Sequence, residues 1–311
     1  MAAAILLTFL SLVLLATGCS QPEPPPPGPL RLYFLNVGQG DGALIITPEG
    51  LTALVDGGDN SRGAGLVAWL HSMGIQRVDW VMPSHPHTDH IGGLNAVLQQ
   101  LTVGASLMSA QEYPTATFRR HKALIAEKRV PLTPATEGTV LHLGAQVTAT
   151  VLNPPAALLA TKEPDEDNSV VLRVCLPPTC ILFTGDIGDE GERALAARYQ
   201  EKADQMRSQV LKVSHHGSAE PNYRSLLEMI KPEVALIGAG AGNPHGHPTR
   251  RALDKLKATG ATIYCTLTDG TVLVEITEEG YTVTRRPDVV IQDSRGGAAP
   301  PDASLAGTCA G

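Results

Sequence analysis

The sequence has few aromatic residues and no excess of positive charge. Aromatic side chains make up 4% of the 311 residues, and the formal net charge is −7. Proteins that hold nucleic acid through charge and stacking need a basic surface and aromatic platforms. The composition therefore gives no sign of a global basic field or of a stacking platform.

Cysteine is also scarce, with five residues, and Cys175 and Cys180 lack the Cys-x-x-Cys spacing of a zinc or redox site. These two cysteines flank Leu-Pro-Pro-Thr at 176–179, so they could face each other across a hairpin. Two interpretations stay open, a disulfide or two small apolar residues in adjacent strands, because a bridge requires Cβ atoms that lie close together.

The first residues differ from the rest of the chain. Met1 to Ala16 is almost uninterrupted apolar sequence that is short for a membrane span and ends in Ala-Thr-Gly-Cys at 16–19. We predict a signal peptide over residues 1–19 that resembles a bacterial lipoprotein signal, with Cys19 acylated. An ordinary secretory signal with an incidental cysteine is the alternative. Residues 20–29 are proline-rich and predict a semi-rigid tether.

The segment from residue 30 to residue 286 predicts one α/β domain, because strand and helix patterns alternate along it. Residues 287–311 are rich in Gly, Ala, Pro and Ser, with no periodic apolar pattern beyond 289–291, and predict a disordered tail. Strands are expected at 32–35, 43–46, 51–55, 78–82, 147–152, 169–174, 180–183, 210–213, 234–237, 262–265 and 272–276, and helices at 64–73, 92–101, 117–128, 189–202, 221–230 and 248–258.

The most informative stretch is Ser-His-Pro-His-Thr-Asp-His-Ile-Gly-Gly at 84–93, directly after an apolar strand pattern. It holds three of the chain's 10 histidines. Imidazole nitrogen and carboxylate oxygen suit zinc, manganese or iron. We expect His85 and His87 to face one ion, and Asp89 and His90 to reach a second.

Three further polar clusters begin where an apolar strand pattern stops. They contain Asp186, the pair His215 and His216, and the pair His245 and His247. Ligands at the ends of several strands on one edge of a sheet can form one site from distant parts of a sequence.

Together these motifs resemble the metallo-β-lactamase-fold hydrolases, and within them the hydrolase domain of the ComEC-type DNA-uptake competence proteins. The resemblance runs in order from about residue 30 to about residue 286. It implies an αββα sandwich with two divalent metal ions, zinc or manganese, in a shallow groove at one edge. The matching segments are 34–41, 54–58, 84–93, 183–186, 211–218 and 246–248.

Roles follow from residue type and from the resemblance. Asp186 is expected to bridge both ions, with a helix N-cap as the alternative. Asp89 counts among the catalytic residues as well as the ligands. His215 is the preferred ligand of the second ion, and His216 is the next choice or a general acid that protonates the leaving oxygen. His247, in Gly-His-Pro, is expected to touch metal or the developing oxyanion.

Supporting positions are also predicted. Asp56 resembles the aspartate that orients ligands in the family, and Asp41 is expected to act in the same way, with turn capping as the alternative for both. His245 is predicted to be exposed to solvent.

One departure from the family concerns the first ion. Many of these enzymes carry a further histidine before the bridging aspartate, but residues 165–169 read Asp-Glu-Asp-Asn-Ser. His121 and His142 are predicted to be surface residues. The first ion would then be held weakly, or its coordination would be completed by Asn168, Asp167 or water.

The resemblance implies a metal-dependent hydrolase that cleaves phosphodiesters, DNA among them, and the predicted signal peptide implies that it acts in the cell envelope. A small phosphodiester is as consistent with the composition as long DNA. An esterase of phosphorylated head groups in envelope polymers and a non-catalytic lipoprotein that binds metal or nucleic acid are alternatives. A β-lactam hydrolase is disfavoured by the segments around residues 39–41 and 246–248. The predicted location is the periplasmic or extracellular face of a membrane, held there by a lipid anchor on Cys19.

Overall fold

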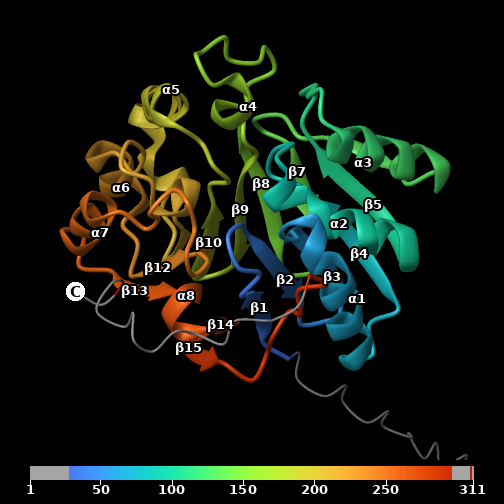
Figure 1. The fold of residues 1–311 in the computed structure, drawn as a ribbon. Coiled ribbons are helices and arrows are strands. Elements are labelled where there is room, and N and C mark those ends of the chain that lie inside the picture. Colours follow the sequence, from blue (N-terminus) through green and yellow to red (C-terminus); the bar gives the residue numbers. More distant parts are fainter. Residues whose placement is uncertain (1–27, 296–308, 310–311) are drawn as a thin grey trace, which may run out of the picture.

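The computed structural model describes residues 28–295 and Cys309. Two β-sheets pack face to face between outer layers of helices (Figure 1). The first sheet has eight strands in the order β15 (Gly280–Arg286), β14 (Thr271–Thr277), β1 (Leu30–Phe34), β2 (Gly42–Ile46), β3 (Thr52–Asp56), β4 (Arg77–Met82), β5 (Thr102–Met108) and β6 (Leu132–Pro134).

The second sheet has seven strands. Its central strands β10, β11 and β12 run parallel to one another, as β3, β4 and β5 do in the first sheet. The order is β13 (Thr262–Cys265), β12 (Val234–Ile237), β11 (Val210–Lys212), β10 (Thr179–Phe183), β9 (Val171–Leu176), β8 (Thr148–Asn153) and β7 (Val140–His142).

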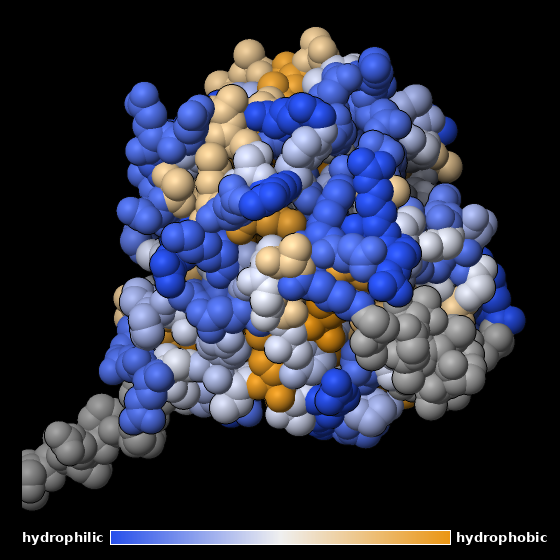
Figure 2. All heavy atoms as spheres, turned by 90° about the vertical axis from the view of Figure 1, so that its left-hand side faces the viewer, coloured by the Kyte–Doolittle hydropathy of each residue, from blue (hydrophilic) through white to orange (hydrophobic). Residues whose placement is uncertain are grey.

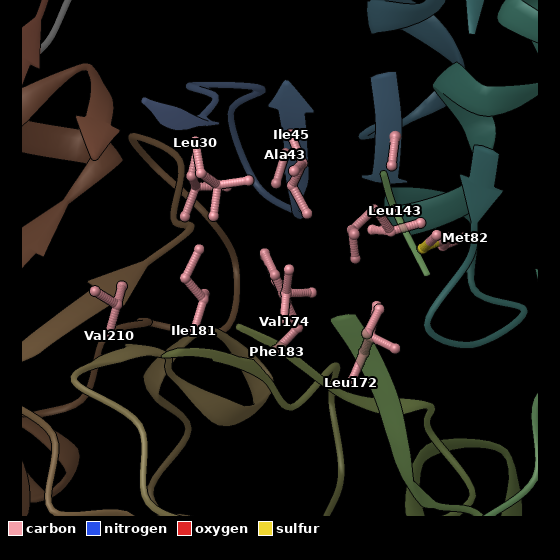
Figure 3. Packing of buried hydrophobic residues seen from close by; sticks show 14 of the residues in the cluster. Leu30, Ala43, Ile45, Met82, Leu143, Leu172, Val174, Ile181, Phe183 and Val210 are labelled. Atoms are coloured by element: carbon pink, nitrogen blue, oxygen red, sulfur yellow. The ribbon is translucent and has the colours of Figure 1, made fainter. Parts of the chain in front are cut away.

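The main core lies between the sheets. Alternate residues along a strand point to opposite faces, so one side of each sheet can be apolar throughout. Leu30 and Ile45 of the first sheet point toward Val174 and Ile181 of the second (Figure 3). The large core that results fixes the two sheets against each other.

Helices cover the outer face of each sheet (Figure 1). On the first sheet α1 (Gly63–Ser72) and α2 (Thr88–Gln100) bury their apolar faces, and α3 (Ala116–Glu127) packs on α2. On the second sheet the cover consists of α5 (Asp189–Tyr199), α6 (Arg224–Ile230) and α7 (Arg250–Lys257). The surface on that side is mainly hydrophilic, with small scattered apolar groups (Figure 2). Shorter helical segments are η1 (Asn60–Arg62), α4 (Pro164–Asp167), η2 (Gln200–Gln205), η3 (Ser214–Gly217) and α8 (Thr266–Asp269).

This architecture confirms the predicted αββα sandwich in a single domain. The strand pattern failed to predict β5, β6, β7 and β15. These strands are partly exposed along much of their length, so their sequences lack a continuous apolar run.

The predicted domain end at residue 286 is wrong, because the chain continues as packed structure to residue 295. Val289 and Ile291 are buried in the cluster that lies beneath α1. Arg62 donates to the carbonyl of Ile291 at 2.9 Å and lies 3.4 Å from the Asp293 carboxylate. The predicted signal peptide with Cys19, most of the predicted tether, and residues 296–308 lie outside the described residues. Among the described residues, no helix is both long enough and apolar enough to cross a bilayer.

The alternatives left open for Cys175 and Cys180 are decided in favour of a disulfide. The two residues are direct partners across the antiparallel pair β9 and β10, with their Cα atoms 4.1 Å apart. The bridge closes the hairpin that precedes Asp186.

Candidate metal centre

The site lies where several parallel strands end. Asp56 is the last residue of β3, Ser84 and His85 follow β4, Asp186 follows β10, and the two histidines at 215 and 216 follow β11. Because the carboxyl ends of neighbouring parallel strands lie on one edge of a sheet, these loops meet between the two sheets.

Four side chains converge most closely. The Nε2 atoms of His90 and His216 lie 3.2 and 3.0 Å from the Oδ2 atom of Asp186. The Asp89 Oδ2 atom lies 3.7 Å from the first of these nitrogens and 3.4 Å from the second. Two imidazole nitrogens and two carboxylates therefore face a common point.

The other ring nitrogens are fixed from behind. His216 Nδ1 donates to the carbonyl oxygen of Gly238 at 2.9 Å, so in the neutral ring Nε2 carries the free lone pair. His90 Nδ1 pairs with Asp56 Oδ2, also at 2.9 Å. The carboxylate of Asp41 lies on this Nδ1 side too, 3.8 Å from His90 and 3.6 Å from His216. Asp41 and Asp56 thus stand where side chains that orient ligands would stand.

The donor set fits a divalent cation. Asp41, His90, Asp186 and His216 each offer an atom within 4.8 Å of the others. We regard Asp89 as a better ligand candidate than Asp41, because it faces the Nε2 atoms. The buried Nε2 atoms of His90 and His216 have no hydrogen-bond partner within the described chain. Unpaired buried nitrogen beside carboxylate oxygen is the chemistry of a metal position.

His85 and His87 form a second group beside the first. His85 is buried, and its ring lies 4.1 Å from that of His90 and 4.5 Å from that of His87 between centroids. Its Nδ1 atom contacts Ser84 Oγ at 3.0 Å, and its buried Nε2 atom has no hydrogen-bond partner in the described structure. His87 Nε2 pairs with Asp165 Oδ2 at 2.6 Å, which leaves Nδ1 free to bind an ion.

Asp167 and Asn168 do not serve this second group, contrary to the prediction. Asp167 Oδ1 accepts from the amide of Gly191 at the start of α5 at 2.8 Å, and Asn168 exchanges hydrogen bonds with the backbone of Leu159. Both side chains hold the fold. The neighbouring Glu166 turns toward the histidines instead, with Oε1 4.0 Å from His87 Nδ1.

The order of preference between the two adjacent histidines is reversed. His215 and His216 both have left-handed backbones, with φ of 47° and 53°, an uncommon conformation for residues other than glycine. This turn directs His216 into the cluster, whereas the half-buried His215 has Nδ1 3.2 Å from Glu166 Oε2. Strained residues of this kind persist where the surrounding structure holds them, and they gather at functional sites.

Lys212, the last residue of β11, belongs to the site although none of the sequence motifs indicated it. This buried side chain donates to the carbonyl of Gly185 at 2.6 Å, lies 3.2 Å from Asp186 Oδ1, and pairs with the Asp41 carboxylate. Its sequence signal is a lysine inside the apolar run 210–213, where an unpaired charge would be costly.

The charges of the cluster are strongly coupled. Burial disfavours the charged form of His90, but the carboxylates of Asp186 and Asp56 outweigh it and raise its pKa well above the ordinary value. Burial acts in the same direction on His216, but the carboxylates of Asp186 and Asp41 outweigh it and raise its pKa well above the ordinary value. Burial opposes ionisation of Asp186, yet nearby cationic groups lower its pKa well below the usual range. Several carboxylates thus compete for positive charge in a space closed to water, which favours a bound cation.

The remaining histidines divide between the site and the scaffold. His247 is half-buried, 5.6 Å from the ring of His215, and burial with neighbouring histidines lowers its pKa to about 4. His245 and His142 are exposed, as predicted. The prediction of an exposed His121 is wrong, because α3 turns this residue inward with Phe118 and its Nδ1 atom pairs with Asn95 Oδ1 at 2.9 Å.

Glycine residues allow the 84–93 segment to pack closely against the loop after β3. Gly93 lies in the first half of α2, and its amide donates to the carbonyl of Gly58 at 2.9 Å. A Cβ atom at Gly93 would overlap the carbonyl oxygen of Gly57. The Gly92-Gly93 pair therefore lets the start of α2 pack directly against the end of β3.

Comparison with known proteins agrees with this geometry. The chain is 28% identical over 242 residues to Competence protein ComA of Neisseria gonorrhoeae, covering 77% of this chain and 31% of that protein. It is 25% identical over 257 residues to ComE operon protein 3 of Bacillus subtilis, covering 77% and 32%. The chain thus spans about a third of the length of these curated relatives. The resemblance to competence proteins is confirmed.

A likeness of fold extends to solved structures. CmlA, a diiron beta-hydroxylase from Streptomyces venezuelae, aligns with a TM-score of 0.52 at 15% identity, over 76% of this chain and 52% of that one. The profile of the Metallo-beta-lactamase superfamily matches residues 35–240. With the sandwich fold and the histidine and aspartate cluster at its edge, the chain belongs to the metallo-beta-lactamase superfamily.

Proposed function

We propose that this protein is a dinuclear metal-dependent hydrolase that cleaves phosphodiester bonds in the cell envelope. The observation that carries the proposal is the set of buried, unpaired Nε2 atoms of His85, His90 and His216 beside the carboxylate of Asp186. A purely structural cluster would leave the buried His85 nitrogen without a partner and would gather His90 and His216 around one carboxylate oxygen without a hydrogen bond, which is costly in a buried site.

The residues divide into two metal positions. Asp89, His90 and His216 would hold one ion, and His85 with His87 would begin the other. Asp186, whose Oδ2 atom lies 3.2 and 3.0 Å from the Nε2 atoms of His90 and His216, would serve both ions, as the sequence predicts. Bound divalent cations would neutralise charge that develops on the reacting oxygen atoms and would lower the pKa of water toward neutrality.

The protein's own groups support this chemistry in three ways. Lys212 neutralises and positions the Asp186 oxygen that faces away from the histidines. Asp56 and the Gly238 carbonyl fix the ring orientation of His90 and His216. His247, whose pKa is lowered to about 4, is neutral near pH 7 and can donate a hydrogen bond to a developing oxyanion.

Support for a phosphodiester substrate comes from the resemblance to the ComEC-type competence proteins, of which Competence protein ComA is a relative of this chain. The acidic composition favours a small or flexible phosphodiester as much as long DNA, since bound cations can invert the local charge. An esterase acting on phosphorylated head groups is the second candidate, favoured by the predicted lipid anchor on Cys19. The disulfide between Cys175 and Cys180 is consistent with export to an oxidising compartment.

The test is a panel of phosphodiesters, phosphomonoesters and a β-lactam, assayed with zinc and with manganese. Asp186→Ala, Asp89→Ala and His87→Ala should each remove nearly all turnover, and combining them should add little, because the ligands act as a unit. His216→Ala belongs to this severe class. His247→Ala should lose about a hundredfold, as expected for one transition-state donor. If metal-replete wild type cleaves none of these substrates faster than Asp186→Ala does, a catalytic function is excluded.

Location has a separate test. A lipid anchor on Cys19 predicts that the mature protein labels with palmitate and partitions into detergent, and that Cys19→Ser blocks processing or releases the protein. An intact mass with an unmodified Cys19 inside a longer chain contradicts the anchor.

A further inference from the structure

The carboxylate of Glu166 lies at the edge of the site, close to His215 and His87. Its side chain is only 15% exposed, on the short helix α4. The buried Oε2 atom lies 3.2 Å from His215 Nδ1 without forming a hydrogen bond, and it has no other hydrogen-bond partner in the part of the chain that the structure describes. A buried carboxylate oxygen in this state is costly unless it binds a cation.

Two histidine nitrogens near Glu166 also lack hydrogen-bond partners among the described residues, so the carboxylate and the nitrogens could share a cation. Oε1 lies 4.0 Å from the free Nδ1 atom of His87, and His85 adds the unpaired, buried Nε2 atom. The ring of His85 lies 4.5 Å from that of His87 and 4.1 Å from that of His90, which contacts Asp186, so the Glu166 side of His87 borders the rest of the cluster. The region holds two imidazole nitrogens, and the third imidazole expected from the family is absent here.

The geometry of the neighbouring residues explains why Glu166 alone fills this place. Asp165 is engaged with His87 Nε2, and Asp167 with the amide of Gly191. Successive residues of a helical turn point about 100° apart, so Asp165 and Asp167 point elsewhere and Glu166 is the residue of the three that lies on the Nδ1 side of His87.

We propose that the Glu166 carboxylate completes the metal position that begins with His85 and His87. The inference rests on the proposed dinuclear function. A carboxylate in place of an imidazole makes this position richer in oxygen, and oxygen ligands suit manganese better than nitrogen or sulfur ligands do. The Glu166 position therefore favours Mn²⁺ relative to a three-histidine position, whereas the position at His90 and His216 retains nitrogen ligands suited to Zn²⁺.

The experiment measures bound metal rather than activity. Metal-stripped wild type, Glu166→Gln and Glu166→His are titrated with Mn²⁺ and separately with Zn²⁺ by calorimetry, and bound ions are counted by elemental analysis. Glu163→Gln is the matched control, because it removes the same charge from an exposed side chain three residues earlier. Circular dichroism verifies that each apo variant is folded, which is expected because glutamine has nearly the shape of glutamate.

Wild type and Glu163→Gln should bind two ions per chain. Glu166→Gln should keep one ion and bind the second at least tenfold more weakly, with the larger loss for Mn²⁺. Glu166→His should recover the second Zn²⁺ more fully than the second Mn²⁺. His215→Ala should still bind two ions, since His215 lies beside Glu166 but is not needed to hold the Glu166 carboxylate at the metal position.

Each contrary result has a distinct meaning. If Glu166→Gln binds two ions with the wild-type Kd for both metals, Glu166 is not a ligand and the inference is overturned, while the proposed function stands. If His215→Ala loses the same ion as Glu166→Gln, Glu166 acts by positioning His215, which also overturns the inference. Wild type that binds no metal refutes both the inference and the proposed function.

Discussion

Lys212 offers a direct test of the electrostatics beneath the metal centre. Lys212→Met keeps the length and much of the volume of the side chain but removes its charge. In metal-stripped protein, the carboxylates of Asp41 and Asp186 then lose the cation that is fixed between them. The variant should therefore be much less stable than wild type.

The size of the effect follows from burial and distance. Nζ lies 3.2 Å from Asp186 Oδ1, and both side chains are almost fully buried. At an effective dielectric constant near 20, that separation corresponds to an attraction of about 5 kcal/mol before desolvation is counted. Removing one partner of a buried pair typically costs about 3–5 kcal/mol, because the other charge stays buried and unpaired. We expect a loss in this range.

The assay is urea unfolding of the metal-stripped protein, with the free energy of unfolding obtained by linear extrapolation. Lys162→Met is the control, because Lys162 is 90% exposed and lies 3.7 Å from Glu190 as a surface pair. That change should alter stability by less than about 1 kcal/mol. Adding Asp41→Asn to Lys212→Met should recover part of the loss, because one uncompensated carboxylate is removed.

Two outcomes would contradict the reasoning. A Lys212→Met protein as stable as the Lys162→Met control would mean that the buried carboxylates do not need the lysine. A double variant less stable than Lys212→Met would mean that Asp41 stabilises the fold by a contact unrelated to charge.

Three further predictions concern pH, the disulfide and metal. Burial lowers the pKa of His121 to about 4, so its neutral ring contributes stability that is complete above the ordinary pKa near 6.5 and is lost as the pH falls to about 4. His121→Gln should abolish this part of the acid destabilisation, which amounts to about 3 kcal/mol across that pH range. Curves of unfolding free energy against pH that run parallel for the two proteins would contradict the prediction. Replacing Cys175 and Cys180 by serine should lower the free energy of unfolding by about 2 kcal/mol, as closure of so short a loop predicts, and a reducing agent should destabilise wild type but not the variant. Chelation should lower the Tm of wild type, and added zinc or manganese should restore it, since a ligand at a hundred times its Kd stabilises a protein by about 3 kcal/mol. The Tm of Asp186→Ala should change much less on chelation and on addition of metal.

The sequence alone determined the fold family and most of the candidate ligands. The 84–93 loop carries four ligand-type side chains in six positions, and the other clusters each follow an apolar run. These signals are local. A strand pattern and the residue that ends it lie next to each other in the chain, and parallel strands bring such ends to one edge in any αββα sandwich.

The tertiary structure decided which side chains turn into the site. His215 and His216 are adjacent in a polar turn, and the choice between them depends on two left-handed backbone conformations and on the Gly238 carbonyl that fixes the inner ring. Likewise, Glu166 faces the histidines because its neighbour Asp167 is engaged by the first turn of α5.

The surroundings of Lys212 and His121 were likewise not predictable from the sequence. A lysine in an apolar run is recognisable as unusual, but its partner Asp41 lies in the loop that leads into β2 of the other sheet, 171 positions earlier in the chain. The inward side of α3 is fixed by its packing on α2. Orientation and charge compensation are set by contacts between segments far apart in sequence, and a pattern that extends over a few residues carries no information about those contacts.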